Sequence, residues 1–438
     1  MVPLTPLQIA FVGLTAIILL ISLRVRIGVA LGLVSFVGIW AIRGFDVAVT
    51  MLRTTPFEFA AHWSLSAIPM FLLMGAVAYH SRITEQIFRV SQLWLGGLPG
   101  GLAVAANWAC AGFAAASGAS IATAAAMGRI TVPEMIRAGY DKGLATGVVA
   151  SAGTLGIMIP PSIAMVLYGI FAEVSIAKLF IAGIFPGLLT AAIYAAMIVI
   201  RCMIKPELAP RTTQVATWPE RWQSVLDAWP LPVLVVGIIC GLYSGLITAT
   251  EAGAGGALLA IVIAFIQRRM SWRVLVDSIV EALTNTARIF FIAFAAVLLS
   301  RFLALSGLPQ FLIDSIGSWA TDPLMLVLLA AFIYIILGMF LDPIGLMLLT
   351  LPLFLPLFQA VGLDLIWIGV LVVKFIEIGL ITPPVGMNVY VINSVTGKDV
   401  PLETIFRGVG WFLLCEVVVV SLLIAFPEIS LFLTGFMD

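Results

Sequence analysis

Apolar runs close to 20 residues long recur along almost the whole of this chain. A helical run of that length crosses the hydrocarbon core of a bilayer, which is about 30 Å thick. Of the 438 residues, 62% are hydrophobic and only 10% are charged, whereas soluble domains carry about 25% charged residues. The alternating polarity of a membrane β-barrel is not seen. The sequence therefore predicts an all-α polytopic membrane protein embedded in a lipid bilayer.

The charge balance and the motifs that are missing narrow the function classes. Lysine plus arginine number 22 and aspartate plus glutamate number 22, so the net charge is +0 and no basic face for nucleic acid is expected. The sequence contains no GxxxxGK[ST] loop, no HExxH and no convincing Ser/His/Asp set. We therefore expect a protein that is not an enzyme and has no nucleotide-driven motor of its own.

Basic residues orient the predicted spans. Arg24 and Arg26 follow the first apolar run, so the positive-inside rule places them in the cytoplasm and the N-terminus outside. Arg82 and Arg268 mark the same side later in the chain, and the polar stretch 206–224 is interpreted as a cytoplasmic linker. An amphipathic segment is expected near 45–60. Full crossings are expected at about 7–23, 27–43, 66–80, 143–170, 177–200, 227–247, 249–267, 283–305, 363–394 and 405–427.

Two stretches do not fit a simple crossing. Residues 100–136 have apolar arms on either side of a small-residue centre, "AASGAS" (115–120), with basic residues after the second arm. Residues 323–360 repeat this pattern around "FLDP" (340–343). We interpret both as re-entrant helical hairpins whose tips lie near the middle of the membrane.

Two of the predicted spans contain a double proline. "GTLGIMIPPS" occupies 153–162 and "EIGLITPPVG" occupies 377–386. Proline removes a backbone donor and clashes with the carbonyl one turn back, and glycine allows the chain to unwind. In lipid, such a break survives only against protein, a cavity or a ligand. We therefore predict broken helices at about 143–170 and 363–394.

The hairpins and the breaks share one sequence offset. Gly156 aligns with Gly379 at an offset of 379 − 156 = 223, and the same shift maps 117–120 onto 340–343. Five crossings are expected before the linker, and because five is odd the second half starts on the opposite side of the membrane. The sequence thus predicts inverted-topology repeats at 1–205 and 225–438, a design common among secondary transporters.

Interrupted helices are suited to binding ions. Opened carbonyls and half-helix C-terminal ends attract a cation, and half-helix N-terminal ends attract an anion. Asp342 lies at the second hairpin tip, where a lone carboxylate is a functional candidate. Sodium ligation is its favoured role, and capping of the helix that starts at Pro343 is a compatible alternative. Polar side chains near the breaks supply further oxygen donors: Ser117, Ser120, Thr154, Ser162, Thr382 and Asn388.

Three other charged residues have simpler interpretations. Glu251 follows a short turn, and we expect it to cap the next helix rather than to face a moving interface. Lys374 and Glu377 are three residues apart on one helical face, so we expect them to pair with each other.

Three blocks resemble one family of transporters. They are similar to the large membrane subunit of tripartite ATP-independent periplasmic (TRAP) transporters, the DctM type. The blocks are residues 117–170, 337–356 ("LGMFLDPIGLMLLTLPLFLP") and 377–392 ("EIGLITPPVGMNVYVI"), and the likeness covers essentially the whole chain. It implies an elevator-type secondary transporter of the bacterial inner membrane that is driven by sodium. A periplasmic binding protein of the DctP type would deliver an organic acid, either a carboxylate or a sulfonate. A small membrane subunit of the DctQ type, expected as a separate chain, would complete the complex.

The resemblance also implies two sodium sites, one between each hairpin tip and the break that follows it. The first would use Ser117, Gly118, Ser120, Gly153, Thr154 and Gly156, and the second Asp342, Gly379, Thr382, Val385 and Met387. The organic acid would lie between the tips, near Ser117, Ser120, Ser162, Thr382 and Asn388. Ala119 stands where the family often has a serine, so both side-chain and backbone oxygens stay open as ligands at the first tip.

Two other functions fit part of the pattern. One is a non-transporting membrane scaffold subunit, which sodium-dependent uptake would exclude. The other is an ion channel, which ion flux without a binding protein would favour.

Overall fold

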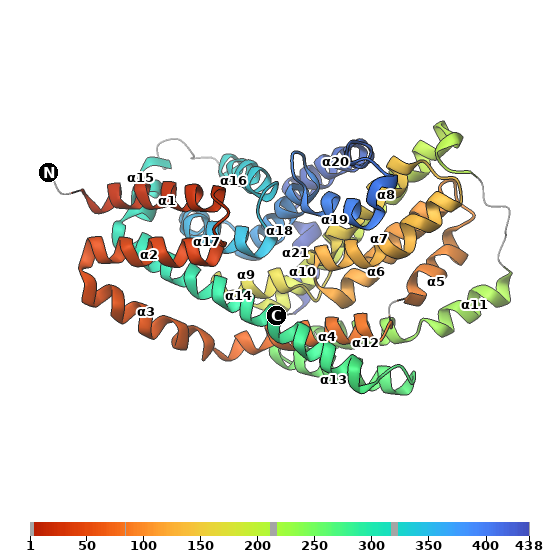
Figure 1. Cartoon of the computed structure of the whole chain (residues 1–438), viewed down its shortest axis with the longest axis horizontal. Coiled ribbons are helices and arrows are strands. Elements are labelled where there is room, and N and C mark those ends of the chain that lie inside the picture. The colour runs from red at the N-terminus through yellow and green to blue at the C-terminus, as the bar shows by residue number, and fades with distance from the viewer. Residues whose placement is uncertain (1–3, 84, 211–216, 317–322, 438) are drawn as a thin grey trace.

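The computed structural model describes residues 4–83, 85–210, 217–316 and 323–437 (Figure 1). Every regular element in these ranges is a helix, so the all-α prediction is confirmed. The first half contains α1 (Pro6–Ser22), α2 (Ile27–Arg43), α3 (Phe45–Ala60), η1 (Trp63–Ser66), α4 (Ala67–His80), α5 (Glu85–Leu95), α6 (Gly101–Ser117), α7 (Ser120–Arg137), α8 (Lys142–Ala152), η2 (Gly153–Ile157), α9 (Ile163–Phe171), α10 (Ile176–Ile204) and η3 (Pro206–Leu208).

The second half is also built from helices in its described residues. It contains α11 (Trp218–Asp227), α12 (Pro230–Tyr243), α13 (Ala249–Ile266), α14 (Trp272–Ser306), α15 (Leu308–Ile316), α16 (Pro323–Gly338), α17 (Pro343–Ala360), α18 (Leu365–Ile381), α19 (Met387–Thr396), η4 (Gly397–Asp399), α20 (Leu402–Ala425), α21 (Glu428–Leu431) and η5 (Thr434–Phe436).

Many of these helices are suited to a membrane. Within the described ranges, six helical segments are long and apolar enough to cross a bilayer: η1 with α4, α10, α13, α14, α17 and α20. The shorter helices α1, α2, α6 and α16 are also apolar. Large apolar side chains such as Val236, Leu258 and Phe332 are exposed on the outside of the chain. A surface of this kind is stable against lipid and unfavourable against water.

Both predicted hairpins form. α6 and α7 pack side by side around a two-residue turn, and α16 and α17 are joined by the turn 339–342. The second arms begin at Ser120 and Pro343, at an offset of 343 − 120 = 223. The offset read from the sequence is therefore also the offset between the observed starts of these helices.

Both predicted breaks also form. In the first, α8 ends at Ala152, the 3-10 turn η2 follows, and α9 starts only at Ile163. In the second, α18 continues to Ile381 and α19 starts at Met387. The Pro160–Pro161 and Pro383–Pro384 bonds are both cis. The two interruptions thus share the double proline but differ in how the preceding helix ends.

The helices form two packed groups (Figure 1). The outer group consists of α2, α4, α13 and the long helix α14, which runs along both α2 and α4. The inner group consists of the hairpins and broken helices, α6–α9 and α16–α19, with α10 and α20. Gly28 and Gly38 bring α2 close to α14, since a Cβ atom at Gly38 would lie 2.2 Å from the Phe302 ring. The groups meet where α4 contacts α6 and where α14 contacts α17.

Two amphipathic helices were not predicted from the sequence. α5 packs against α11, part of which lies in the predicted linker 206–224. The Trp94 indole donates a hydrogen bond to the Arg221 carbonyl at 3.4 Å and meets the Trp222 ring edge to face. The linker residues 211–216 lie outside the described ranges. The expected span 283–305 belongs to α14, which begins much earlier, at Trp272.

Candidate functional site

The first hairpin tip touches the first break through two glycines. Gly118 has a left-handed backbone (φ +61°), and a Cβ atom there would lie 2.7 Å from the Pro161 carbonyl oxygen. A Cβ atom at Gly156 would lie 2.7 Å from the Ala119 carbonyl oxygen. Both approaches are to backbone atoms, so no side-chain rotation relieves them. These glycines therefore allow the first tip and the first break to contact each other directly.

Hydroxyl groups add oxygen atoms to this tip. The Ser117 and Thr123 hydroxyl oxygens are 2.8 Å apart, and Thr123 also donates to the Ala119 carbonyl at 2.9 Å. Thr123 was not among the predicted site residues, although its place one turn into the second arm was a usable signal. The first tip consequently gathers carbonyl and hydroxyl oxygens and has no carboxylate of its own at residues 117–120.

One hydrogen bond between the two halves of the chain joins two predicted substrate-binding residues. The Asn388 amide donates to the Ser120 hydroxyl at 2.8 Å and to the Ala150 carbonyl at 3.1 Å. The Asn388 Oδ1 atom is buried and has no hydrogen-bond partner within the described residues. Ser120 and Asn388 lie in the first turns of α7 and α19. The N-terminal ends of these two helices, from opposite halves of the chain, therefore meet at this bond.

Three other predicted hydroxyls are engaged locally. Thr154 donates to the Ser151 carbonyl at 2.7 Å, and Thr382 donates to the Ile378 carbonyl at 2.6 Å. Ser162 donates to the Ile157 carbonyl at 2.6 Å and caps α9. Within the described ranges, no hydrogen bond joins Ser162 or Thr382 to the Ser120–Asn388 pair.

The second hairpin also contacts its own break. A Cβ atom at Gly379 would lie 2.7 Å from the Gly338 Cα atom, so α16 and α18 approach backbone to backbone. Gly386 has a left-handed backbone (φ +59°), and its amide donates to the Met339 carbonyl at 3.3 Å. Val385, half-buried, lies in the turn before Met387, the first residue of α19.

Asp342 caps the second arm of this hairpin. Its Oδ1 atom accepts a hydrogen bond from the Gly345 amide at 2.8 Å, and Pro343 occupies the first helical position. The capping alternative is therefore confirmed, and it is compatible with a ligand role because a carboxylate has four lone-pair sites. No group of three or more His, Cys, Asp or Glu side chains occurs in the described part of the chain. A cation held here would need carbonyl and hydroxyl oxygens beside Asp342.

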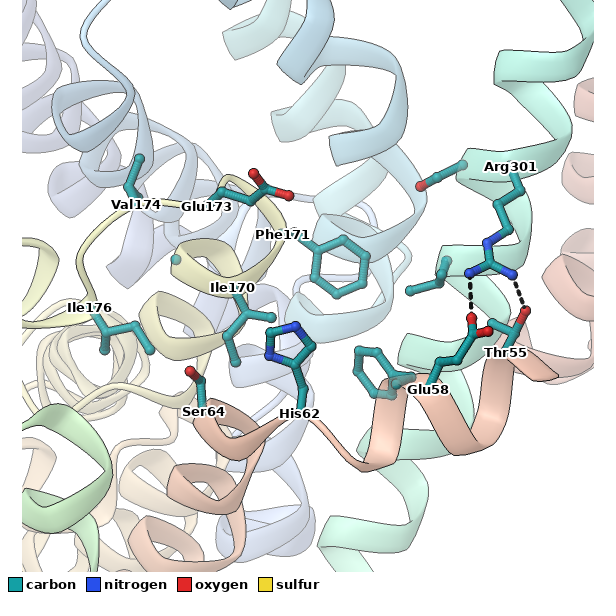
Figure 2. A pocket seen from close by; sticks show the side chains of 14 residues that line it. Thr55, Glu58, His62, Ser64, Ile170, Phe171, Glu173, Val174, Ile176 and Arg301 are labelled. Carbon is teal, nitrogen blue, oxygen red and sulfur yellow. Dashed lines mark hydrogen bonds and ion pairs between the residues drawn. The ribbon is translucent and has the colours of Figure 1, made fainter.

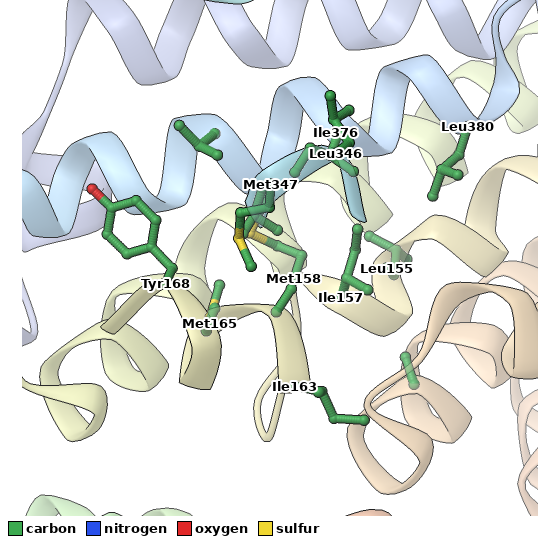
Figure 3. Packing of buried hydrophobic residues seen from close by; sticks show 14 of the residues in the cluster. Leu155, Ile157, Met158, Ile163, Met165, Tyr168, Leu346, Met347, Ile376 and Leu380 are labelled. Atoms are coloured by element: carbon green, nitrogen blue, oxygen red, sulfur yellow. The ribbon is translucent and has the colours of Figure 1, made fainter. Parts of the chain in front are cut away.

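Apolar side chains surround the first break (Figure 3). Leu155 and Met158 from the break meet Leu346 from α17 and Ile376 from α18, and all four are fully buried. The second half of the chain thus covers the interruption in the first half. This packing keeps water away from the opened backbone, which strengthens electrostatic interactions there.

A buried ion cluster fixes α18 to its neighbours. Lys374 Nζ lies 2.9 Å from Glu377, 2.9 Å from Glu416 on α20 and 3.0 Å from the Thr190 hydroxyl on α10. Tyr194 donates a further hydrogen bond to Glu416. The predicted Lys374–Glu377 pair is confirmed. Glu416 was missed, although a lone carboxylate in the apolar run "LLCEVVVV" was a signal.

Glu251 takes the role expected for it. Its carboxylate accepts a hydrogen bond from the Thr248 amide at 2.8 Å, and its own amide donates to the Thr248 hydroxyl at 3.3 Å. This reciprocal arrangement is a capping box at the start of α13.

A cavity of about 630 Å³ separates the outer group from the inner group (Figure 2). It lies between α3, the α9–α10 connection and α14. Arg301 donates to Glu58 at 2.7 Å and to Thr55 at 2.8 Å, and His62 and Glu173 line the space between the groups. The two groups are therefore not fully packed against each other on this side.

These features define an all-helical, multi-pass membrane protein with two helical hairpins and two broken helices. Comparison with known proteins identifies the family of membrane proteins to which the chain is similar. The model of the DctM component of tripartite ATP-independent periplasmic transporters matches residues 14–429. The structure is similar to that of the YdaH transporter of Alcanivorax borkumensis, with a TM-score of 0.61, 14% identity and coverage of 88% of this chain and 89% of that one.

Several named relatives are similar over most of the chain. The C4-dicarboxylate TRAP transporter large permease protein DctM of Pseudomonas aeruginosa is 36% identical, over 90% of this chain and 94% of its own length. The isethionate TRAP transporter permease protein DctMQ of Oleidesulfovibrio alaskensis is 30% identical, over 98% and 66%. The ectoine TRAP transporter large permease protein TeaC of Halomonas elongata is 32% identical, over 84% and 86%.

The chain belongs to the DctM family of TRAP transporter large permeases. It is accordingly a multi-pass protein of the bacterial inner membrane and a transporter rather than an enzyme. Membership implies DctQ-type and DctP-type partners, and the DctMQ relative shows that the membrane parts also occur in a single chain.

Proposed function

We propose that this permease couples sodium entry to the uptake of an organic acid that a periplasmic binding protein delivers. A small membrane subunit on a separate chain completes the complex. Relatives named for C4-dicarboxylate and isethionate support a carboxylate or a sulfonate as the transported group. Each hairpin–break pair holds one sodium ion, so two ions bind to each chain.

The observation that carries this proposal is the contact of each tip with its own break. Gly156 meets the Ala119 carbonyl at the first pair, and the Gly386 amide donates to the Met339 carbonyl at 3.3 Å at the second, in both cases backbone against backbone. Contacts of this kind collect peptide oxygens where two helices are interrupted, and sodium is held at such interruptions in secondary transporters. Asp342 supplies a charged oxygen at the second pair only.

The acid binds where the N-terminal ends of α7 and α19 meet. Each helix N-terminus carries a partial positive charge and free backbone amides, which attract a carboxylate or sulfonate. The Asn388–Ser120 hydrogen bond marks this point. An ion at either tip places positive charge close to the acid, so each ligand strengthens the binding of the other.

Transport follows an elevator movement in which the inner group slides against the outer group. Residues 1–205 and 225–438 act as the inverted repeats, and the common offset of 223 between Ser120 and Pro343 supports this division. The buried Lys374 cluster ties α10, α18 and α20 into one body. The cavity of about 630 Å³ gives this body room beside α3 and α14.

Reconstituted vesicles test the proposal. The permease, the small subunit and the binding protein are combined in proteoliposomes, and uptake of labelled acid is measured with and without an inward sodium gradient. We expect uptake only with sodium and all three components. Asp342→Ala and Thr382→Ala should reduce it, whereas Glu403→Gln, an exposed carboxylate on α20, should not. Unchanged uptake in both site variants would contradict the site.

A further inference from the structure

A second cavity, of about 340 Å³, lies beside the first hairpin. The end of α4 and both arms of the hairpin enclose it. Its lining consists of Tyr79, His80, Arg82, Phe113, Ala126, Arg129 and Ile130. Nothing in the function proposed above uses this space.

The cavity begins one helical turn from the hairpin tip. α4 contacts the tip at Gly75, where a Cβ atom would lie 3.1 Å from the Ser117 carbonyl oxygen. Tyr79 follows Gly75 by four residues, and Phe113 precedes Ser117 by four residues. Four residues of helix span about 6 Å. The cavity therefore lies next to the tip, on the side of the tip that α4 covers.

The cavity faces the side that the sequence places in the cytoplasm. Arg269 donates a hydrogen bond to the Arg82 carbonyl at 2.6 Å, so the ends of α4 and α13 lie together. Both ends carry the arginines that the positive-inside rule places inside.

Arg129 provides this cavity with a cation that can bind a ligand. His80 is paired with Glu281 at 2.7 Å. Arg129 is exposed, and its guanidinium has no hydrogen-bond or ion-pair partner within the ranges that the structure describes. Arg129 lies nine residues after Ser120 on the same helix, which places it about 13 Å further from the tip. Tyr79 and Phe113 form an apolar wall between the tip and this charge.

We propose that this cavity is an exit site for the transported organic anion, with Arg129 as the group that pairs with its carboxylate or sulfonate. A guanidinium binds both groups through paired N–H donors, and the aromatic wall suits the carbon part of the acid. Because Arg129 is exposed to solvent, the pairing is weak enough to release the acid. This inference rests on the function proposed above and adds a residue that acts only on the cytoplasmic side.

Counterflow in proteoliposomes tests the exit site. Vesicles containing all three components are loaded with increasing concentrations of unlabelled succinate or isethionate, whichever the wild type transports, and entry of the labelled acid is measured. Arg129→Gln should raise the internal concentration for half-maximal exchange about threefold, equivalent to about 0.6 kcal/mol, as expected for an exposed ion pair. The external concentration for half-maximal uptake should not change. Arg137→Gln, an exposed arginine two turns further along α7, should change neither value.

Three results for Arg129→Gln would overturn the exit site. The internal concentration for half-maximal exchange could stay unchanged, or the internal and external concentrations could rise equally. The rise could also disappear in vesicles without anionic lipids, which would assign Arg129 to a lipid headgroup. Failure of the proposed function looks different, because the wild type would then show no sodium-driven exchange. In that case, the exit site is tested by measuring the binding of labelled succinate and isethionate to the purified complex instead of exchange. Equal binding by wild type and Arg129→Gln would then reject the site.

Discussion

The first hairpin tip reads Ser-Gly-Ala-Ser at 117–120, whereas the corresponding tip of the second hairpin reads Phe-Leu-Asp-Pro at 340–343. Ala119 and Asp342 both precede the second arm of their hairpin, but only Asp342 caps that arm with its side chain. One tip is therefore small and neutral, and the other is bulky and carries a carboxylate.

The two breaks differ in the same sense. Thr154, Pro160 and Pro161 in the first break are buried, whereas Pro383 and Pro384 in the second are exposed. A sodium ion in the first pair would be held by neutral oxygens in a dry environment, and one in the second pair by a carboxylate nearer the surface. Neutral ligands do not offset the charge of an ion that has left water. We therefore expect the second pair to bind sodium more tightly.

The largest expected effect comes from removing the only carboxylate at the tips. Asp342→Ala should raise the sodium concentration for half-maximal uptake at least tenfold, about 1.4 kcal/mol or more, because the charge that attracts the ion is lost. It should also lower stability by about 1 kcal/mol through loss of the helix cap. Sodium titrations of uptake and thermal unfolding of the purified protein measure the two effects.

Asp342→Asn separates these two roles. The amide oxygen still accepts the hydrogen bond from the Gly345 amide, so most of the stability should return while the sodium requirement stays high. If Asp342→Ala and Asp342→Asn both kept the sodium requirement of the wild type, Asp342 would act only as a helix cap and not as a sodium ligand.

The next effect concerns the backbone contacts that both pairs share. Gly156→Ala and Gly379→Ala each place a Cβ atom 2.7 Å from a backbone atom of the facing hairpin. Each should lower stability by about 1–3 kcal/mol and reduce uptake severalfold. Gly410→Ala on α20 is the control, since a Cβ atom there meets nothing within 4 Å. A loss of uptake in only one of the two glycine variants would show that the two hairpin–break pairs are not equivalent.

A smaller effect is expected at the point where the halves meet. Asn388→Ala removes the hydrogen bonds to Ser120 and Ala150 and should cost about 1–2 kcal/mol. The concentration of acid for half-maximal uptake should rise, with little change in the sodium requirement. Asn393→Ala, which loses one bond to the Val400 carbonyl, is the matched control. Equal behaviour of the two variants would remove Asn388 from the acid site.

The smallest effect tests the neutral tip directly. Ala119→Ser adds a hydroxyl oxygen to the first pair, and we expect the sodium requirement to fall about twofold, equivalent to about 0.4 kcal/mol. Sodium titrations at saturating acid measure this change. A higher sodium requirement would mean that the first tip has no room for another ligand oxygen.

Local signals made much of the fold predictable. Double prolines and glycines mark the breaks, and Pro343 after Asp342 marks the capped second arm, because these residues act on the backbone within one turn. The helices α5 and α11 were missed because they are amphipathic and lack the long apolar run that identifies a span.

Contacts between distant residues were beyond prediction from one sequence. Asn388 and Ser120 are 268 residues apart, and their hydrogen bond depends on how α19 packs against α7 and α8. Glu416 completes the Lys374 pair only because α20 lies beside α18. The polar residues near the breaks were found from the sequence, but the partners of Ser120 and Asn388 were set by packing.

Counting bound sodium tests the central claim most directly. Equilibrium binding of radioactive sodium to the purified complex should give two ions per chain in the wild type. Asp342→Ala should retain only one, held by the neutral pair at the first tip. Failure of the wild type to bind two ions, or an unchanged count in Asp342→Ala, would contradict the account.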